Sequence, residues 1–516
     1  MSSQSYGLPR DAAADESGRV GRNVTVLAGG QLITWTMTLL WTLVVPRTLG
    51  PAGMGTIMAA WSITGILGVV LGLGTRNYLV RESVVDPDAA PRLVGTALLL
   101  RLVLSPVLLG AAFAYGQVVG WGHDARTVLY LAAAATIFVQ IAEPLQAAFQ
   151  SIEQMQYLAY SDIISKSGQG LVGIVVVLLG SGTIGVTACW AVMTGLVVLL
   201  DLYWLRGRLR VDLRTSTRQM ARIAKASLPY WAFGLFFMVY LWIDFVMLSL
   251  LTRSEVVGWY SVPTRLFQTM MFLPVVIATA WLPRFVRSFE VSRERLGEVA
   301  RSPVELVMLL SLPIAALTVV ASKPLIGVLY GSAYHHSVPV MVILGLCIPP
   351  MYLNIMLAQV LIAMNRQMVW TWVMAATTVV NPLFNLALIP WTQHRYGNGA
   401  IGASISLLLT ELVCVGAGYV LIGRLVFDLG TARRTVLGLG IAGAMWAVGY
   451  ELEPVAGWAP ALLAAALVFP ALAALLRLFT PDELALIRSG LAKARNKVPG
   501  LRRVVASAPR EAPQSS

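Results

Sequence analysis

Two charged residues lie inside long apolar stretches of this chain, where a charge is costly. Asp244 falls within an apolar run at about 227–251, and Arg265 falls within a second run at about 256–282. Each run is long enough to cross a bilayer core of about 30 Å as a helix rising about 1.5 Å per residue. A charge deep in such a span costs at least a few kcal/mol, so it normally faces a partner, a bundle interior or a water-filled cavity. The acid and the base therefore mark a candidate functional site.

The composition is that of a membrane protein. The chain has 516 residues, 57% hydrophobic and 12% charged, whereas soluble domains carry about 25% charged residues. The net charge of +13 would suggest nucleic acid as a partner of a soluble chain. Here the basic residues lie between apolar runs, so membrane topology explains them and we expect no nucleic-acid partner. Cys189, Cys347 and Cys414 fall in apolar runs without metal-ligand spacing, which predicts neither a disulfide framework nor a metal site.

The apolar runs predict an all-α fold with fourteen transmembrane helices. They lie at roughly 24–46, 55–75, 92–114, 127–149, 158–180, 184–204, 227–251, 256–282, 303–322, 338–362, 368–390, 399–422, 433–450 and 458–478. If the N-terminus lies inside, the segments on its side hold thirty Lys and Arg, the opposite loops hold five, and three lie within spans. This asymmetry predicts a multi-pass protein of the cytoplasmic membrane with both termini in the cytoplasm.

The longest polar segments divide the chain into six parts. We expect a disordered cytoplasmic tail at 1–22, a six-helix bundle at 23–205, a basic cytoplasmic linker at 206–226, a second six-helix bundle at 227–425, two additional transmembrane helices at 426–479 and a basic cytoplasmic tail at 480–516. Thr480 and Glu483 have the spacing of a capping box, which would begin a helix in the last part. Two interpretations of this tail stay open, a helix on the inner leaflet and a solvated basic segment.

The two six-helix bundles are related by an internal repeat. Gly258 follows Gly55 by 203 positions, in similar surroundings within the first hairpin of each half. Three further matches keep the same order with a slowly growing offset: Pro106 with Pro313, Gln154 with Gln367, and Gly182 with Gly399. A unit of six spans enters the membrane from the same side twice, so we expect a pseudo-two-fold axis along the membrane normal. Binding sites in such proteins form between the halves near the midplane.

Four stretches, in this order and spacing, resemble O-antigen-type polysaccharide flippases of the multidrug/oligosaccharidyl-lipid/polysaccharide exporter superfamily. They are VPRTLGPAGMGTIMAAWS, WIDFVMLSLLTRSEVVGWYSVPTRL, LIGVLYGSAYHHSVPVMVILGL and GNGAIGASISLLLTE. The resemblance covers roughly residues 22–425 and implies two six-helix bundles with alternating access to a central cavity. It implies that a polyprenyl-pyrophosphate-linked oligosaccharide is flipped from the inner to the outer leaflet for cell-surface polysaccharide biosynthesis. It also implies, as partners, membrane lipids and the polymerase and glycosyltransferases of the same pathway.

Such a cargo carries a pyrophosphate, and arginine suits phosphate because its fork donates two hydrogen bonds and keeps its charge. By the resemblance, Arg265 matches a cavity arginine of the eighth span and Asp244 matches an acid of the seventh-span pattern. Arg101 and Arg76 are further candidates for substrate binding. Two alternatives stay open. Arg265 would pair with Asp244 merely to hold two helices together, and Arg101 would reach the lipid headgroups.

Other polar residues in the spans are expected to serve the structure. Glu143 and Glu411 would cap or pair within their bundles. Hydrogen bonds between helices are expected from four amides, with sugar contacts as the alternative: Asn354, Gln359, Asn381 and Asn385.

No enzyme, cofactor or catalytic residue is predicted. The GxGxxG patterns lack a βαβ context, GxxxxGK[ST] is absent, and the four histidines lack the HExxH spacing. Two rival functions stay open: a cation-coupled multidrug exporter of the same superfamily, and a membrane polysaccharide polymerase or glycosyltransferase. The longest outer connection, 321–337, contains no Asp or Glu, which counts against the enzyme. The sugar, the energy source and the oligomeric state do not follow from the sequence.

Overall fold

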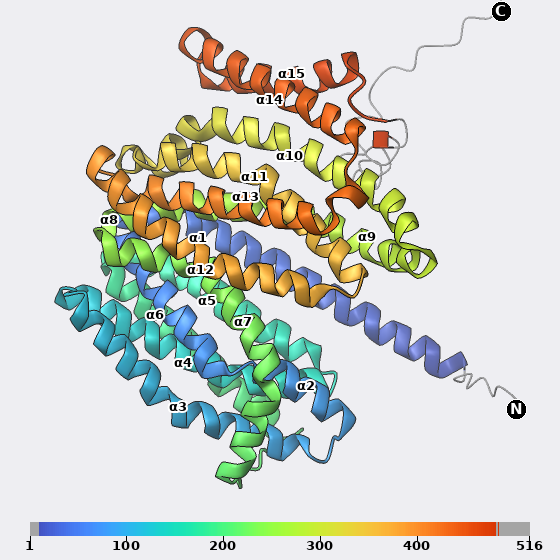
Figure 1. Cartoon of the computed structure of the whole chain (residues 1–516). Coiled ribbons are helices and arrows are strands. Elements are labelled where there is room, and N and C mark those ends of the chain that lie inside the picture. Colours follow the sequence, from blue (N-terminus) through green and yellow to red (C-terminus); the bar gives the residue numbers. More distant parts are fainter. Residues whose placement is uncertain (1–9, 481–482, 485–516) are drawn as a thin grey trace, which may run out of the picture. The chain divides into compact units, whose positions relative to one another are not determined.

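The computed structural model describes residues 10–480, 483 and 484, and the regular elements within them are all helices. Figure 1 shows these helices in chain order. They are α1 (Arg10–Gly72), α2 (Thr75–Val85), α3 (Ala90–Val118), α4 (His123–Ser151), α5 (Met155–Leu178), α6 (Gly182–Leu205), α7 (Thr217–Leu251), α8 (Ser254–Met270), α9 (Phe272–Val291), α10 (Arg293–Tyr330), the short 3₁₀ helix η1 (Ser332–Tyr334), α11 (Ser337–Ala363), α12 (Gln367–Tyr396), α13 (Gly399–Val426), α14 (Leu429–Ala456) and α15 (Trp458–Leu475). The all-α class predicted from the sequence is confirmed.

Thirteen stretches of the described residues are long and apolar enough to span a membrane. The first, Thr34–Val85, has 52 residues, and a helix of that length would extend about 78 Å, more than two crossings of a core of about 30 Å. It contains Gly50, whose φ of 68° and ψ of 178° interrupt α1 in a conformation that glycine adopts readily. Since this break separates the first two predicted spans, the thirteen stretches account for the fourteen predicted helices. The chain is a multi-pass membrane protein.

The predicted eighth helix is two helices in the structure. α8 ends at Met270 and α9 begins at Phe272, so the continuous helix expected at 256–282 is interrupted. Pro274 explains the position of the break, because its ring has no N–H and would clash with the carbonyl four residues earlier, that of Met270. The freed Met270 carbonyl instead accepts a hydrogen bond of 2.6 Å from the Tyr352 hydroxyl.

The chain forms two compact units. The first comprises the described residues up to Thr269 together with Ser322–Leu344 and Met368–Cys414; the second comprises Met270–Ala321, Gly345–Gln367 and the described residues from Val415 onward. In the first unit, α1 packs on α5 and α4 packs on α6. Six of the thirteen buried residues of α4 are alanines. Small side chains let helix backbones approach closely, which matters in lipid because lipid tails are as apolar as leucine and provide no hydrophobic drive.

In the second unit, an ionic network joins α10, α14 and the start of the C-terminal tail. Arg434 of α14 forms ion pairs with Glu305 of α10 and with Glu483, and it donates to the Leu478 carbonyl at 3.0 Å. Glu305 also accepts a hydrogen bond from the Thr431 hydroxyl. Both carboxylates are buried, so each needs such a partner. The network fastens the two additional helices and the described start of the tail to α10.

The start of α14 is capped by Asp428, which accepts from the Thr431 backbone N–H at 2.8 Å. That hydrogen bond, with smaller contributions from the Thr431 hydroxyl and Arg301, holds the pKa of Asp428 below its usual range. The predicted capping box of the tail is also present. The Glu483 N–H donates to the Thr480 hydroxyl at 3.3 Å, and the Thr480 N–H donates to the Glu483 carboxylate at 2.8 Å.

Both chain ends extend past the described residues. α1 begins at Arg10 and so includes 10–22, a segment expected from the sequence to be disordered. Residues 1–9, 481–482 and 485–516 lie outside the described residues, and with them most of the two tails predicted at 1–22 and 480–516.

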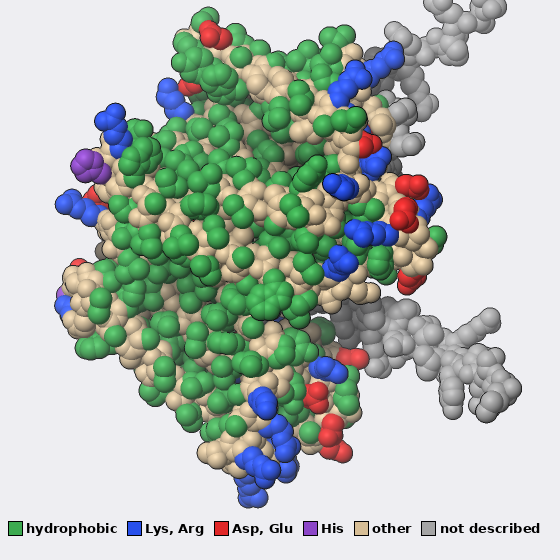
Figure 2. Space-filling view, in the orientation of Figure 1, with side chains coloured by type: hydrophobic (Ala, Val, Ile, Leu, Met, Phe, Trp, Pro, Cys, Tyr) green, Lys and Arg blue, Asp and Glu red, His purple; other side chains and the backbone are tan. Residues whose placement is uncertain are grey.

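The surface of the described residues is apolar along the helices and basic near helix ends. Figure 2 shows apolar side chains over the flanks of the helices and clusters of Lys and Arg near helix ends. One cluster covers the segment before α7 and its first turns, where Arg206, Arg208, Arg214 and Arg218 are exposed. Extensive exposed apolar surface marks contact with lipid or protein, and the basic segment that we expect to face the cytoplasm is accessible.

Candidate functional site

Arg265 lies well inside α8, about 16 Å along the helix from Ser254 at about 1.5 Å per residue. Its side chain is half-buried against α1. Its Nη2 lies 3.8 Å from the Met58 sulfur, and its guanidinium carbon lies 5.9 Å and 5.8 Å from the ring centroids of Trp41 and Trp61. Within the described part of the chain, no carboxylate forms an ion pair with it. The cation is held by aromatic faces and not by an acid.

Several hydrogen-bond donors around Arg265 have no acceptor among the described residues. Trp41 and Trp61 stack with their ring centroids 5.5 Å apart, and Trp190 packs on Trp61 at 5.1 Å. The indole N–H groups of Trp41 and Trp61 are buried without a partner, as is the hydroxyl of Tyr330, which is near enough to Arg265 to interact electrostatically. A buried donor without an acceptor costs about 1–3 kcal/mol. A cation among unused donors is an arrangement that an anion would complete.

Asp244 of α7 is buried and does not contact Arg265. Its Oδ2 accepts from the Tyr260 hydroxyl at 2.9 Å, and its Oδ1 accepts from Asn385 Nδ2 of α12 at 2.7 Å. Asn385 Nδ2 also donates to Asn381 Oδ1 at 2.8 Å, and Asn381 Nδ2 donates to the Thr410 hydroxyl of α13 at 3.3 Å. The two asparagines thus join helices by hydrogen bonds, as predicted. The hydrogen-bond partners of the carboxylate are all neutral.

A second carboxylate lies near the first. Tyr240 of α7 donates a hydrogen bond to Glu411 of α13, which agrees with the expectation that Glu411 pairs within its bundle. Tyr240 also interacts electrostatically with Asp244. The oxygen atoms of Asp244, Asn381, Asn385 and Thr410 therefore gather in one buried place, and Asn385 Oδ1 has no hydrogen-bond partner. Oxygen ligands of this kind suit a hard cation, and a carboxylate with neutral partners suits a proton.

Arg101 and Arg76 are placed differently from Arg265. Arg101 of α3 is 1% exposed, its Nη1 donates to the Thr75 hydroxyl at 2.8 Å, and its Nη2 pairs with Glu143 at 3.0 Å. It therefore does not extend to the headgroups, and Glu143 pairs within its bundle as predicted. Because Thr75 begins α2, its hydrogen bond with Arg101 holds the break between α1 and α2 in place. Arg76 is half-buried in α2 and, among the described residues, has no ion pair.

The sequence did not point to several of these groups. Trp41, Trp61 and Tyr330 were missed because an aromatic residue in an apolar span looks the same whether it faces lipid, core or cavity. Asp201 of α6 was also missed, although a charge inside a span is the signal that identified Asp244. It is fully buried and accepts from the Ser161 hydroxyl at 2.5 Å.

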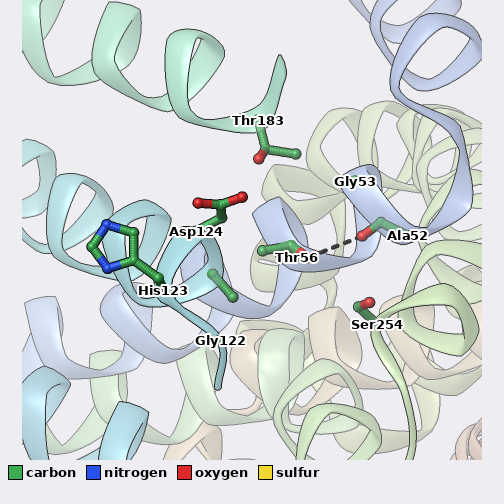
Figure 3. Close-up of a pocket in the computed structure, with 9 residues that line it drawn as sticks. Ala52, Gly53, Thr56, Gly122, His123, Asp124, Thr183 and Ser254 are labelled. Carbon is green, nitrogen blue, oxygen red and sulfur yellow. Dashed lines mark hydrogen bonds between the residues drawn. The ribbon is translucent and has the colours of Figure 1, made fainter. Parts of the chain in front are cut away.

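The ends of the helices near the start of α8 carry shallow pockets. One of about 440 Å³, here called the end pocket, is lined by Ala52, Thr56, Asp124, Thr183 and Ser254 among others. Figure 3 shows the Asp124 carboxylate directed toward the two threonines, while His123 points away. The end pocket is made of helix ends and contains neither Arg265 nor Asp244.

A histidine pair lies by a neighbouring pocket of about 500 Å³. The rings of His335 and His336 are 3.8 Å apart, and His336 packs on Trp259 at 4.3 Å. Burial, and then the neighbouring His335, lower the pKa of His336. In the part of the chain that the structure describes, no group of three or more His, Cys, Asp and Glu could hold a metal ion.

Comparison with known proteins points to one kind of transporter. A family model described as "Polysaccharide biosynthesis protein" matches residues 20–289, and the MatE model matches residues 235–387. The chain is 21% identical over 374 residues to the probable low-salt glycan biosynthesis flippase Agl15 of Haloferax volcanii. That match covers 71% of this chain and 76% of the relative.

Two solved structures share the fold. The lipid II flippase MurJ in an inward closed conformation superposes with a TM-score of 0.68 at 12% identity, covering 88% of this chain and 98% of that one. An inward-facing multidrug resistance transporter of the MATE family superposes with a TM-score of 0.61 at 15% identity, covering 76% of this chain and 95% of that one. Both have the two-lobe helical bundle fold, so the predicted fold class is confirmed.

Proposed function

The chain belongs to the polysaccharide biosynthesis protein family, and from this we propose that it flips a polyprenyl-pyrophosphate-linked oligosaccharide from the inner to the outer leaflet of the cytoplasmic membrane. It is a flippase of the multidrug/oligosaccharidyl-lipid/polysaccharide exporter superfamily and not an enzyme. The cargo and the direction of movement are the parts that the proposal adds.

The observation that carries the proposal is the surroundings of Arg265. A guanidinium inside a span, half-buried and without an ion pair among the described residues, keeps its charge available for a ligand. The unused hydroxyl of Tyr330 adds a donor of the kind that a pyrophosphate oxygen accepts. The lipid tail can remain in the bilayer while the polar head crosses beside this group.

Arg265 therefore ranks first among the four candidate residues. Arg76 has no ion pair within the described part and stays a secondary candidate at the break between α1 and α2. Arg101 has its guanidinium engaged by Thr75 and Glu143, so its proposed role is to hold that break.

We assign Asp244 to the step that couples an ion gradient to transport. Its carboxylate, the orphan Asn385 Oδ1 and the oxygens of Asn381 and Thr410 offer a site for a monovalent cation or a proton. Binding there would change the charge of a buried cluster that joins α7, α12 and α13, and so couple an ion gradient to movement of these helices. In this proposal Asp244 binds the coupling ion, and Arg265 binds the pyrophosphate head of the cargo.

The orientation follows from charge. The exposed basic segment before α7 faces the cytoplasm under the positive-inside rule, which puts both termini on that side. The histidines and the end pocket then lie at the outer face.

The test is depletion of the protein in its own cells, followed by mass spectrometry of the polyprenyl-pyrophosphate glycans. We expect complete repeat units to accumulate and to be accessible only from the cytoplasmic leaflet. An unchanged pool would refute the proposal. Single units that reach the outer leaflet but are never joined would also refute it, and would favour the polymerase considered above.

The second candidate function is multidrug export, which the MatE match at 235–387 supports. A cationic drug would be repelled by Arg265, for which the described residues provide no counter-ion. Resistance profiling separates the two functions. Depletion of a drug exporter would directly change the tolerance of the cells to cationic compounds, and depletion of a flippase would not.

A further inference from the structure

A pocket of about 380 Å³ lies at the end of α13, within the second compact unit. It is lined by Arg293, the first residue of α10, and by the consecutive residues 419–425 of α13. The α13 residues include Tyr419 and, in the last turn of the helix, a second arginine, Arg424. We call this the two-arginine pocket. It presents two guanidinium groups and a phenol, and it contains none of the residues around Arg265.

Close packing of α10 on α13 places the two arginines beside the same pocket. A Cβ atom added to Gly297 of α10 would lie 2.7 Å from the Leu425 carbonyl oxygen of α13, whereas real Cβ atoms essentially never approach another atom closer than 3.0 Å. The two helices therefore meet at a distance that glycine permits. Arg293 precedes Gly297 by four residues and so lies on the same face of α10, one turn away, while Arg424 adjoins Leu425 in the sequence.

Neither arginine of the pocket has a counter-ion among the described residues. Arg293 and Arg424 are both exposed, and no carboxylate of the described part forms an ion pair with either. Two nearby acids, Glu298 and Asp428, are engaged by other arginines of α10, at 2.8 Å and 2.6 Å. Two like charges beside one pocket repel each other, and an anion bound between them would remove that repulsion.

The exposed face of α13 changes from apolar to cationic as it reaches the pocket. Gly416, Val420 and Arg424 recur every four residues and are all exposed, so they lie along one face of the helix. Val420 is 84% exposed, and a Cβ atom added to Gly416 would meet no atom within 4 Å. At about 1.5 Å per residue, this face extends about 12 Å from Gly416 to Arg424. A lipid has the same order of groups, because its acyl chain is apolar and its phosphate lies at the end.

We propose that the two-arginine pocket binds the phosphate of an anionic phospholipid of the inner leaflet, whose acyl chain lies along the exposed face of α13. Arginine forks donate paired hydrogen bonds to phosphate oxygens, and the first turn of a helix, here that of α10, favours an anion. The volume of about 380 Å³ is near the lower end of ligand pockets, which suits a glycerophosphate head and not a chain of sugars. Only the choice of leaflet rests on the orientation proposed above, and the site does not depend on the cargo.

The experiment uses the purified full chain in phosphatidylcholine vesicles that contain increasing amounts of a photo-crosslinkable phosphatidylglycerol. Mass spectrometry of the peptides locates the crosslink, which we expect within 416–425 of α13. The variant that carries both Arg293→Gln and Arg424→Gln should bind phosphatidylglycerol about tenfold more weakly, since it lacks both cations of the pocket. The matched control carries Arg287→Gln and Arg295→Gln, which remove two exposed arginines of the same unit outside the pocket and should leave the affinity unchanged. All four positions are exposed, so both variants should fold.

Equal affinities of the two double variants, or a crosslink confined to other helices, would overturn the proposal. A second arm replaces phosphatidylglycerol with a polyprenyl-pyrophosphate glycan, for which we expect the pocket variant to keep its affinity. Loss of affinity for the glycan alone would identify the cargo as the occupant and would also overturn the proposal. The first arm contains no cargo and measures no flipping. Its failure would therefore refute the lipid site alone, whereas an unchanged glycan pool after depletion would refute the proposed function alone.

Discussion

Arg265→Ala is expected to abolish export of the glycan while the protein stays in the membrane at its normal amount. Charge-assisted hydrogen bonds to phosphate contribute about 1.5–3 kcal/mol each. Loss of one or two of them would weaken binding of the pyrophosphate head about 10- to 100-fold or more. Arg265→Lys should retain part of the activity, because lysine keeps the charge but lacks the planar fork. The measurement is the rate of glycan appearance at the cell surface together with the binding affinity of the purified variant.

The matched control is Arg295→Ala. Arg295 is exposed on α10, and the one ion pair it forms among the described residues is with Glu298 three residues away, a surface contact of little value. Its removal should leave export unchanged. Normal export by Arg265→Ala would refute the proposed phosphate site. An equal loss of export by Arg295→Ala would show that loss of any arginine impairs the protein.

Asp244→Asn should uncouple flipping from the ion gradient without weakening cargo binding. Asparagine has nearly the size of aspartate, its one carbonyl oxygen can still accept from Asn385 Nδ2, and its amide can donate to the Tyr260 hydroxyl oxygen. The helices should therefore remain joined, but asparagine can neither release a proton nor supply a charge to a cation. In vesicles with an imposed sodium or proton gradient, we expect the stimulated component of flipping to disappear. The affinity for lipid-linked glycan should remain within about twofold of wild type, because Asp244 does not contact Arg265.

Asp201→Asn is the control for losing a buried carboxylate as such. Asp201 is buried like Asp244 and likewise accepts from neutral donors. It lies in α6, however, and its donors are Ser161 of α5 and Gln146 of α4. It should keep the gradient-stimulated component. If Asp244→Asn kept it as well, or if both variants lost it, Asp244 would have no specific part in coupling.

The helices were predictable because the bilayer fixes their length and excludes unpaired backbone groups. The capping box of Thr480 and Glu483 was predictable for a similarly local reason, since both of its hydrogen bonds join residues three positions apart. The break at Met271 was not, because prolines are common in membrane helices and Pro274 alone does not say whether its helix bends or ends.

The site was only half predictable. Hydropathy identified Asp244 and Arg265 as costly, but it could not show that Asp244 would contact α12 and α13 while Arg265 contacts the indoles of α1. Similarly, the repeat showed that Gly55 and Gly258 are equivalent, and only the fold shows that they touch. Side-chain direction within an apolar span leaves no pattern in the sequence, because lipid-facing and buried positions both favour apolar residues.

The most direct test of the account uses the purified chain in phospholipid vesicles that contain a polyprenyl-pyrophosphate oligosaccharide. A glycosidase added outside cleaves only the glycan of the outward-facing leaflet, so the inner share is protected without a flippase. With the wild-type chain and an imposed ion gradient, we predict that the protected share becomes cleavable, and that Arg265→Ala restores the protection. If the share stayed protected in the presence of the folded wild-type chain, the central claim that this protein flips a lipid-linked oligosaccharide would be contradicted.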